Sequence, residues 1–207
     1  DSTLFDANAD TRRDSLRIGF TRVAIEAGIA SAYDPDQSYF YDVPVEMRIY
    51  GDRRNNNEFN IGVSPTVGAQ FNRESSLGLN SEIRYIGGGI DTTSQNRFFL
   101  VANPVFKFQN EKFRLKAGIN FSYFTNSIDS SGFTNLGPDI EVAYAINPTS
   151  LTAFAGVTSS MQNNTYESMI AENRYLSNDE RNSPTIERYQ VFGGVKGKVH
   201  QAIDFEA

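Results

Sequence analysis

The sequence predicts an all-β fold: an antiparallel up-and-down transmembrane β-barrel with at least ten strands. Three observations support this prediction. Apolar and polar residues alternate over many segments, the segments are long enough to cross a bilayer, and short links between them alternate with long ones. We expect the 207 residues to form one barrel domain, 1–207, that is incomplete at both ends.

The longest alternation runs from Phe59 to Phe71. Every odd position in it is apolar, counting Pro65, and every even position is polar or glycine. About 13 residues at about 3.3 Å each span about 43 Å, and a tilt of roughly 45° reduces this to a rise of about 30 Å. That rise matches the hydrocarbon thickness of a bilayer. The segment therefore predicts a membrane-crossing strand.

Other segments repeat the pattern, although two are less regular. In 98–108 apolar residues occupy both faces, and 15–30 changes phase between Phe20 and Val23, which indicates a β-bulge. The regular segments are 43–49, 77–85, 113–123, 140–146, 151–157 and 189–199.

The links between these segments sort by length. We expect tight links at 72–76, 109–112, 147–150 and 199–201, and long ones at 87–97, 125–138 and 160–188. Short turns at one end and long loops at the other are typical of outer-membrane barrels. Aromatic residues near the predicted strand ends match interfacial girdles, although aromatic residues also favour strands in general. They are Phe71, Tyr85, Phe108, Phe113 and Tyr123.

The alternation assigns each residue to one of two faces. The predicted lipid-facing residues are Phe59, Ile61, Val63, Val67, Phe71, Leu115, Ile119 and Phe121. The predicted lumen-facing residues are Glu82, Arg84, Lys107, Arg114, Lys116, Glu141, Lys196 and Lys198. Such charges are costly in lipid. They either line a pore and tune its selectivity or form salt bridges that fill a closed barrel, and the sequence leaves both open.

Nothing in the sequence predicts an enzyme, a cofactor site or a metal site. The one histidine, His200, falls in an expected turn, where it is solvated rather than part of a catalytic triad, and there is no cysteine. The glycines 87–89 lack the following helix that a phosphate loop needs, and Asp34-Pro35-Asp36 is too short for a calcium loop. A net charge of −6 argues against nucleic acid as a partner.

The longest predicted loop, 160–188, has helical character. Asn164 is a candidate N-cap with Glu167 three residues later, as in a capping box. Tyr166, Met169 and Ile170 follow at helical spacing, so a short amphipathic helix could cover the lumen or dock a partner. The alternative is an ordered surface loop with one helical turn.

Two stretches, Tyr166–Leu176 and Ile186–Gly197, resemble a family of Bacteroidetes outer-membrane proteins, the TonB-dependent-receptor-like barrels. The chain departs from that family because it shows no plug domain and no TonB box. The resemblance implies location in the bacterial outer membrane, with lipid and other envelope proteins as partners. We therefore expect a pore or transporter for small solutes. The alternatives are a non-transporting accessory barrel subunit of a protein-insertion or secretion complex and, less favoured, a soluble lipid-binding β-protein.

Overall fold

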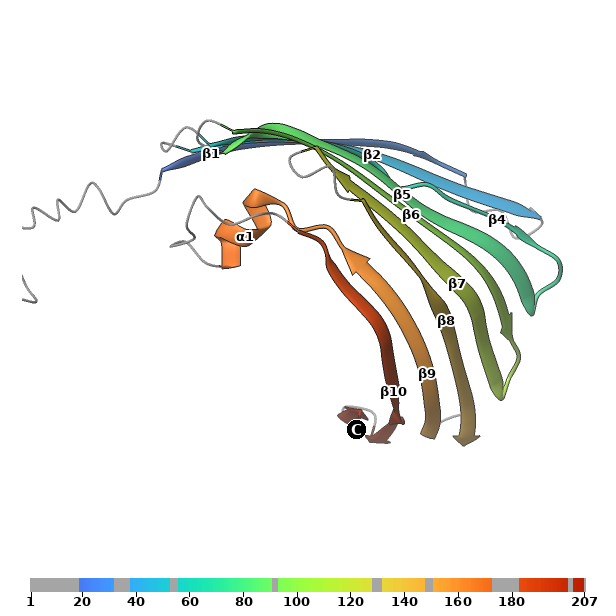
Figure 1. Ribbon diagram of the computed structural model, residues 1–207. Helices are drawn as coiled ribbons and strands as arrows, with labels where there is room; N and C mark the ends of the chain where they lie inside the picture. The colour runs from blue at the N-terminus through green and yellow to red at the C-terminus, as the bar shows by residue number, and fades with distance from the viewer. Residues whose placement is uncertain are drawn as a thin grey trace, which may run out of the picture.

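In the computed structural model the chain forms one strongly curved antiparallel sheet with a short helix on its concave side (Figure 1). The structure describes residues 19–31, 38–52, 56–90, 93–127, 132–147, 151–172, 183–200 and 203–206. The strands are β1 Phe20–Ala30, β2 Tyr39–Asp52, β3 Asn57–Val63, β4 Thr66–Gln70, β5 Ser75–Ile90, β6 Thr93–Gln109, β7 Phe113–Asn126, β8 Gly132–Asn147, β9 Leu151–Gln162, β10 Thr185–His200 and β11 Ile203–Glu206, and the helix is α1 Tyr166–Glu172.

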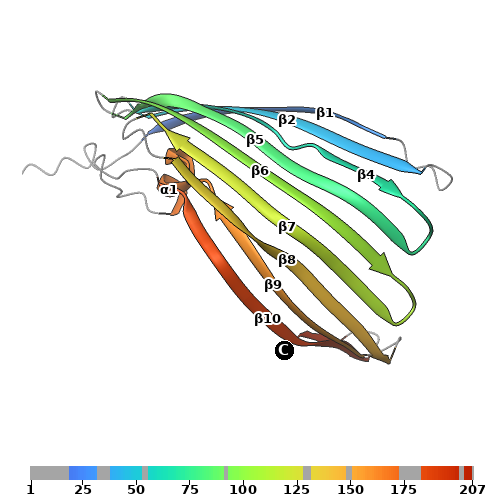
Figure 2. The ribbon, with the colours of Figure 1, turned by 45° about the vertical axis from the view of Figure 1, so that its right-hand side comes forward.

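Strand order follows the sequence, which confirms the predicted all-β, antiparallel, up-and-down fold. Seen from another side, β5 to β10 lie next to one another at a common inclination (Figure 2). Among the described residues, β1 and β11 are the two edges of the sheet. No helix in the described ranges is long and apolar enough to span a membrane.

The predicted strand 59–71 corresponds to β3 and β4 together. Both pair with β5 in one register, since Val63 is opposite Ile83 and Thr66 is opposite Asn80. The ladder is interrupted only at 64–65, where Pro65 has no N–H to donate. The gap is bridged because the Pro65 carbonyl accepts a hydrogen bond from the Ser81 N–H at 2.9 Å.

Two segments were predicted to be irregular: the first strand, with a β-bulge, and β6, with apolar residues on both faces. The predicted β-bulge near Phe20 is wrong, because β1 pairs with β2 in an unbroken register from Phe20 to Ala30. The phase change has another cause: the Phe20 ring stacks on Tyr50, with centroids 6.0 Å apart. In β6, apolar residues do occupy both faces, and Phe99 and Val105 are almost completely buried on the concave side.

The predicted long links at 87–97 and 125–138 are wrong. β5 continues to Ile90 and β6 begins at Thr93, while β7 ends at Asn126 and β8 begins at Gly132. Cross-strand pairing satisfies the backbone of these segments, so they remain extended hairpins. The short links after Gln70 and Gln109 are confirmed, whereas the turn expected at 199–201 falls after His200, which still belongs to β10.

Small residues on the concave side allow the sheet to curve. Gly68 lies opposite Phe40 and Gly156 opposite Phe192, and each ring folds over its glycine. A Cβ atom at Gly68 would lie 2.3 Å from the Phe40 ring, and one at Gly156 would lie 2.5 Å from the Phe192 ring. Aromatic cover of a glycine is a recurrent device of curved sheets.

Candidate functional site

The convex face of the sheet is apolar and exposed. Phe59, Ile61 and Val67 are 36%, 39% and 42% exposed, and Phe71 and Ile119 are 63% and 53% exposed. Their cross-strand neighbours share this character: Ile61 pairs with Tyr85, and Val63 with Ile83. The remaining predicted lipid-facing residues, Leu115 and Phe121, lie in the same layer, opposite Val142 and Leu136. The predicted set therefore shares one face, which contacts no other described element.

Aromatic side chains form two levels on this face. The upper level, at the end of the strands that lies near α1, consists of Phe59, Tyr85, Phe98 and Tyr123. The lower level, at the opposite end, consists of Phe71, Phe108, Phe113 and Tyr144. Between the two levels, the described convex positions of β3 to β8 carry no charged side chain. The lower level lies beside the short turns, whereas Tyr85 and Tyr123 lie inside strands rather than at their ends, because β5 and β7 extend further than predicted.

The concave face carries the charged residues, including those predicted to face a lumen. Arg84 donates to Glu82 at 2.9 Å and lies 3.4 Å from Glu46, and Lys116 lies 2.7 Å from Asp139. The register puts Lys107 opposite Lys116, and Lys116 opposite Glu141. Arg114 and Lys196 lie in the same layer, opposite Ala143 and Thr152, whereas the side chain of Lys198 lies outside the described residues.

A ladder of polar side chains crosses the middle of this face. Asn103 accepts a hydrogen bond from Asn80 at 3.3 Å and donates to Asp139 at 3.0 Å, and Asp139 also accepts from Lys116. Asn103 Nδ2 also donates to the carbonyl of Ile119, opposite Pro104, which has no N–H. Ordered ladders of polar and charged side chains thus cover part of the concave face.

Helix α1 folds back onto the concave face near the upper ends of the strands (Figure 1). Its N-cap is Thr165 rather than Asn164: Thr165 Oγ1 accepts from the Ser168 N–H, and Ser168 Oγ accepts from the Thr165 N–H, both at 3.0 Å. The predicted capping box is therefore displaced by one residue. Glu167 instead forms a 2.6 Å ion pair with Arg22 of β1.

A buried ion pair anchors the start of α1. Arg97 and Glu58 are 3% and 5% exposed and lie 2.5 Å apart. Glu58 also accepts from the Tyr166 N–H at 3.0 Å, and Arg97 donates to the Asn164 carbonyl at 2.7 Å. Both charges thus hold backbone of the helix segment as well as each other.

The helix side chains complete this contact. Tyr166 and Ile170 are buried in a cluster with Tyr50. The Tyr166 hydroxyl accepts from Asn56 at 2.8 Å and donates to Asp52 at 3.2 Å. The predicted apolar helix face is therefore turned toward the sheet, with Met169 half-buried. A role in covering the concave side fits this arrangement, whereas Tyr166 and Ile170 are not accessible to a partner.

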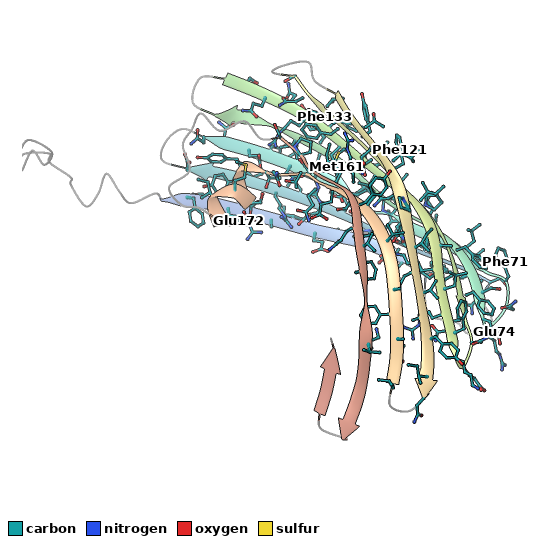
Figure 3. All side chains as sticks on the ribbon, turned by 60° about the horizontal axis from the view of Figure 1, so that its bottom comes forward. Phe71, Glu74, Phe121, Phe133, Met161 and Glu172 are labelled. Carbon is teal, nitrogen blue, oxygen red and sulfur yellow. The ribbon has the colours of Figure 1, made fainter. Side chains whose placement is uncertain are left out.

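Below α1 lies an open groove of about 420 Å³ between the helix segment and the sheet. Its floor includes Phe99 and Met161, which pack with Phe124 in a small apolar cluster. Met161 and Glu172 lie on the side of the sheet that carries α1, whereas Phe71 and Glu74 lie at the turn at the far end (Figure 3). Further lining residues are Arg48, Glu82, Arg84 and Asn163.

Sequence reasoning missed the anchoring residues. Arg97 falls in a segment expected to be a link, and Glu58 directly precedes the predicted strand that begins at Phe59, so their positions on paired strands were not predicted. Their signal is their phase: Glu58 continues the polar positions of β3, and Arg97 continues the concave positions of β6. No group of metal-ligating side chains occurs in the described part of the chain, and Asp34–Asp36 lies outside it.

Together these features define a single curved antiparallel sheet with an apolar outer face, a polar inner face and an inward-folded helix. No family model, curated protein or solved structure matches this chain in the three comparisons that we made.

Proposed function

We propose that this chain forms part of the wall of an outer-membrane β-barrel whose polar lumen passes small solutes. Helix α1 would narrow this lumen from the inside. The observation that carries the proposal is the contrast between the two faces. The convex face is exposed, apolar and uncharged between its aromatic levels, and the charges of the same strands lie on the concave face. This is the arrangement that a strand between lipid and water requires.

The distance between the aromatic levels supports a lipid environment. Phe59 and Phe71 are twelve positions apart on β3–β4, which corresponds to about 40 Å along the strand. A tilt of about 45° makes the height about 28 Å, close to the apolar band of about 25 Å in outer-membrane barrels. The resemblance of two stretches to Bacteroidetes barrel proteins points to the same location.

The experiment is reconstitution of the full-length protein in planar lipid bilayers. We expect stepwise ionic conductance. We also expect the double variant Arg97→Leu/Glu58→Leu to change the conductance, because it removes the anchor of α1. Arg114→Leu, an exposed concave residue at the opposite end of the strands, is the matched control and should leave α1 in place. Absence of conductance in every preparation would contradict a solute pore.

A second candidate is an accessory barrel subunit without transport. The ordered ladder from Asn80 to Lys116 and the buried Arg97–Glu58 pair favour it, because they occupy part of the concave face. Gentle detergent extraction distinguishes the two. A silent bilayer together with a stoichiometric envelope partner would favour the accessory role, and a conducting protein recovered alone would favour the pore.

A further inference from the structure

A second pocket lies at the end of the strands that is far from α1, beside the turn between β6 and β7 (Figure 2). Its volume is about 290 Å³, close to the lower limit of about 300 Å³ that is usual for ligand pockets. Five of its lining residues occupy concave positions: Lys107, Gln109, Arg114, Lys116 and Glu141. The other two, Phe108 and Leu115, lie between them on β6 and β7. We call this site the basic pocket.

Two of the three cationic side chains in the basic pocket have no ion-pair partner. Lys116 lies 2.7 Å from Asp139, which is 8% exposed. Lys107 and Arg114 are exposed, and within the described ranges the side chain of neither forms a hydrogen bond or an ion pair. Even when Asp139 is counted together with Glu141, three cations face two carboxylates. The pocket therefore keeps an excess of positive charge.

The strand order separates this excess from the carboxylates. Asp139 and Glu141 both belong to β8, and Glu141 lies opposite Lys116 on β7. Lys107 belongs to β6, so two strand spacings, or roughly 10 Å, separate its backbone from β8. Its other cross-strand neighbour, on β5, is the uncharged Ser76. The β6 side of the pocket thus contains no carboxylate.

The pairing of Lys107 with Lys116 also favours an anion. The register places these two lysines directly opposite each other on β6 and β7. Like charges at directly opposite positions destabilise an antiparallel pair of strands. An anion bound between the two strands would relieve this repulsion, whereas a bound cation would increase it.

Three side chains can donate hydrogen bonds to one anion. Lys107 and Gln109 are two residues apart on β6 and so share a face, and Arg114 lies opposite Gln109 and diagonal to Lys107. Opposite and diagonal neighbours on one face lie within reach of long side chains. A guanidinium binds a phosphate or a carboxylate through two parallel N–H groups, and an ammonium adds a compact positive charge. The donor set therefore matches an oxyanion.

We propose that the basic pocket binds the oxyanion group, phosphate or carboxylate, of a small solute. The pocket is on the concave face, away from the exposed apolar surface, so the solute comes from the water of the lumen rather than from a lipid headgroup. The inference deepens the proposed function, because it names the class of solute that the lumen would take. It rests on that function for passage alone, since binding can be measured without transport.

The test is calorimetric titration of the full-length protein in detergent, at constant ionic strength because exposed charges are screened by salt. The probes are sodium phosphate and sodium succinate, with glucose and choline chloride as uncharged and cationic probes. We expect at least one oxyanion to bind and the other two probes not to bind. Short-chain phosphatidic acid tests the other source of phosphate, and its binding without that of either free oxyanion would overturn the inference.

Three variants locate the binding. Lys107→Gln and Arg114→Leu should each weaken oxyanion binding roughly tenfold, because each removes a charged donor. Lys107→Arg keeps the charge and should retain binding. Lys196→Gln is the matched control: it removes a positive charge of the same face, but Lys196 lies over the Phe154 ring, outside the basic pocket. Equal weakening by Lys196→Gln, or none by Lys107→Gln and Arg114→Leu, would overturn the inference.

The outcomes also separate the two proposals. Oxyanion binding that Lys107→Gln weakens, in a protein that shows no conductance, would support the basic pocket and contradict the pore. Conductance without oxyanion binding would contradict the basic pocket and leave the pore intact. Binding of choline or glucose in place of the oxyanions would overturn the inference.

Discussion

The two faces of one sheet differ in how the sequence specifies them. The convex face is uniform: its positions are apolar and exposed, and they make no specific contact beyond their neighbours on adjacent strands. The concave face is specific, with ion pairs, amide ladders, glycines beneath aromatic rings and a docked helix. The comparison teaches that the outer face is fitted to a solvent, whereas the inner face is fitted to particular partners within the chain.

The largest expected effect lies on the specific face. Arg97→Leu would leave Glu58 buried without its ion-pair partner, and we expect a loss of about 3–5 kcal/mol in the free energy of unfolding. Urea unfolding in lipid vesicles measures the loss, and limited proteolysis reports whether the α1 segment is released. The double variant Arg97→Leu/Glu58→Leu should recover part of the stability. A single variant as stable as the parent protein would show that the pair does not anchor α1.

The second largest effect tests whether the convex face lies in lipid, by comparing the cost of an arginine at two depths. Val67→Arg places a charge between the aromatic levels, and we expect it to cost about 2–4 kcal/mol of unfolding free energy in vesicles. Phe71→Arg on the same line of strand is the matched control at the lower level, where the cost is about 0–1 kcal/mol. Equal effects at the two positions would argue against a lipid-embedded convex face.

A smaller effect tests the close contacts behind the curvature. Gly68→Ala forces a Cβ atom against the Phe40 ring and to 2.8 Å from the Leu77 carbonyl, and overpacking of this kind costs about 1–3 kcal/mol. Gly51→Ala is the control, because nothing lies within 4 Å of a Cβ at that position. Urea midpoints compared at constant m-value provide the measurement. If the two alanines behave alike, the Phe40–Gly68 contact does not limit the curvature.

Alternation predicted the strands and the assignment of residues to faces because both depend on local periodicity alone. Residues such as Ile61 and Arg84 therefore fall on the expected sides. The ends of strands could not be predicted in this way. Gly88 looks like part of a loop, yet it pairs with Gln95 and lies so close to Asn57 that a Cβ would be 2.2 Å from its carbonyl oxygen. The need for glycine there comes from a neighbouring strand.

The anchor of α1 was also beyond local reasoning. The spacing offered a short helix as one of two interpretations of this segment, the other being an ordered loop with one helical turn. The choice of Thr165 over Asn164 as the cap depends on where the segment is held. That position is fixed by Glu58 and Arg97, which are 39 residues apart in sequence and meet only through the register of β3, β5 and β6. Contacts of this kind require knowledge of the pairing.

The most direct test of the central claim is the lipid exposure of the convex face. The sequence contains no tryptophan. Each of the variants Ile119→Trp, on the convex face, and Lys107→Trp, on the concave face, therefore carries one tryptophan as its fluorescent probe. In vesicles made with brominated acyl chains, we predict strong fluorescence quenching for Ile119→Trp and weak quenching for Lys107→Trp. Equal quenching of the two, or stronger quenching at 107, would contradict the account.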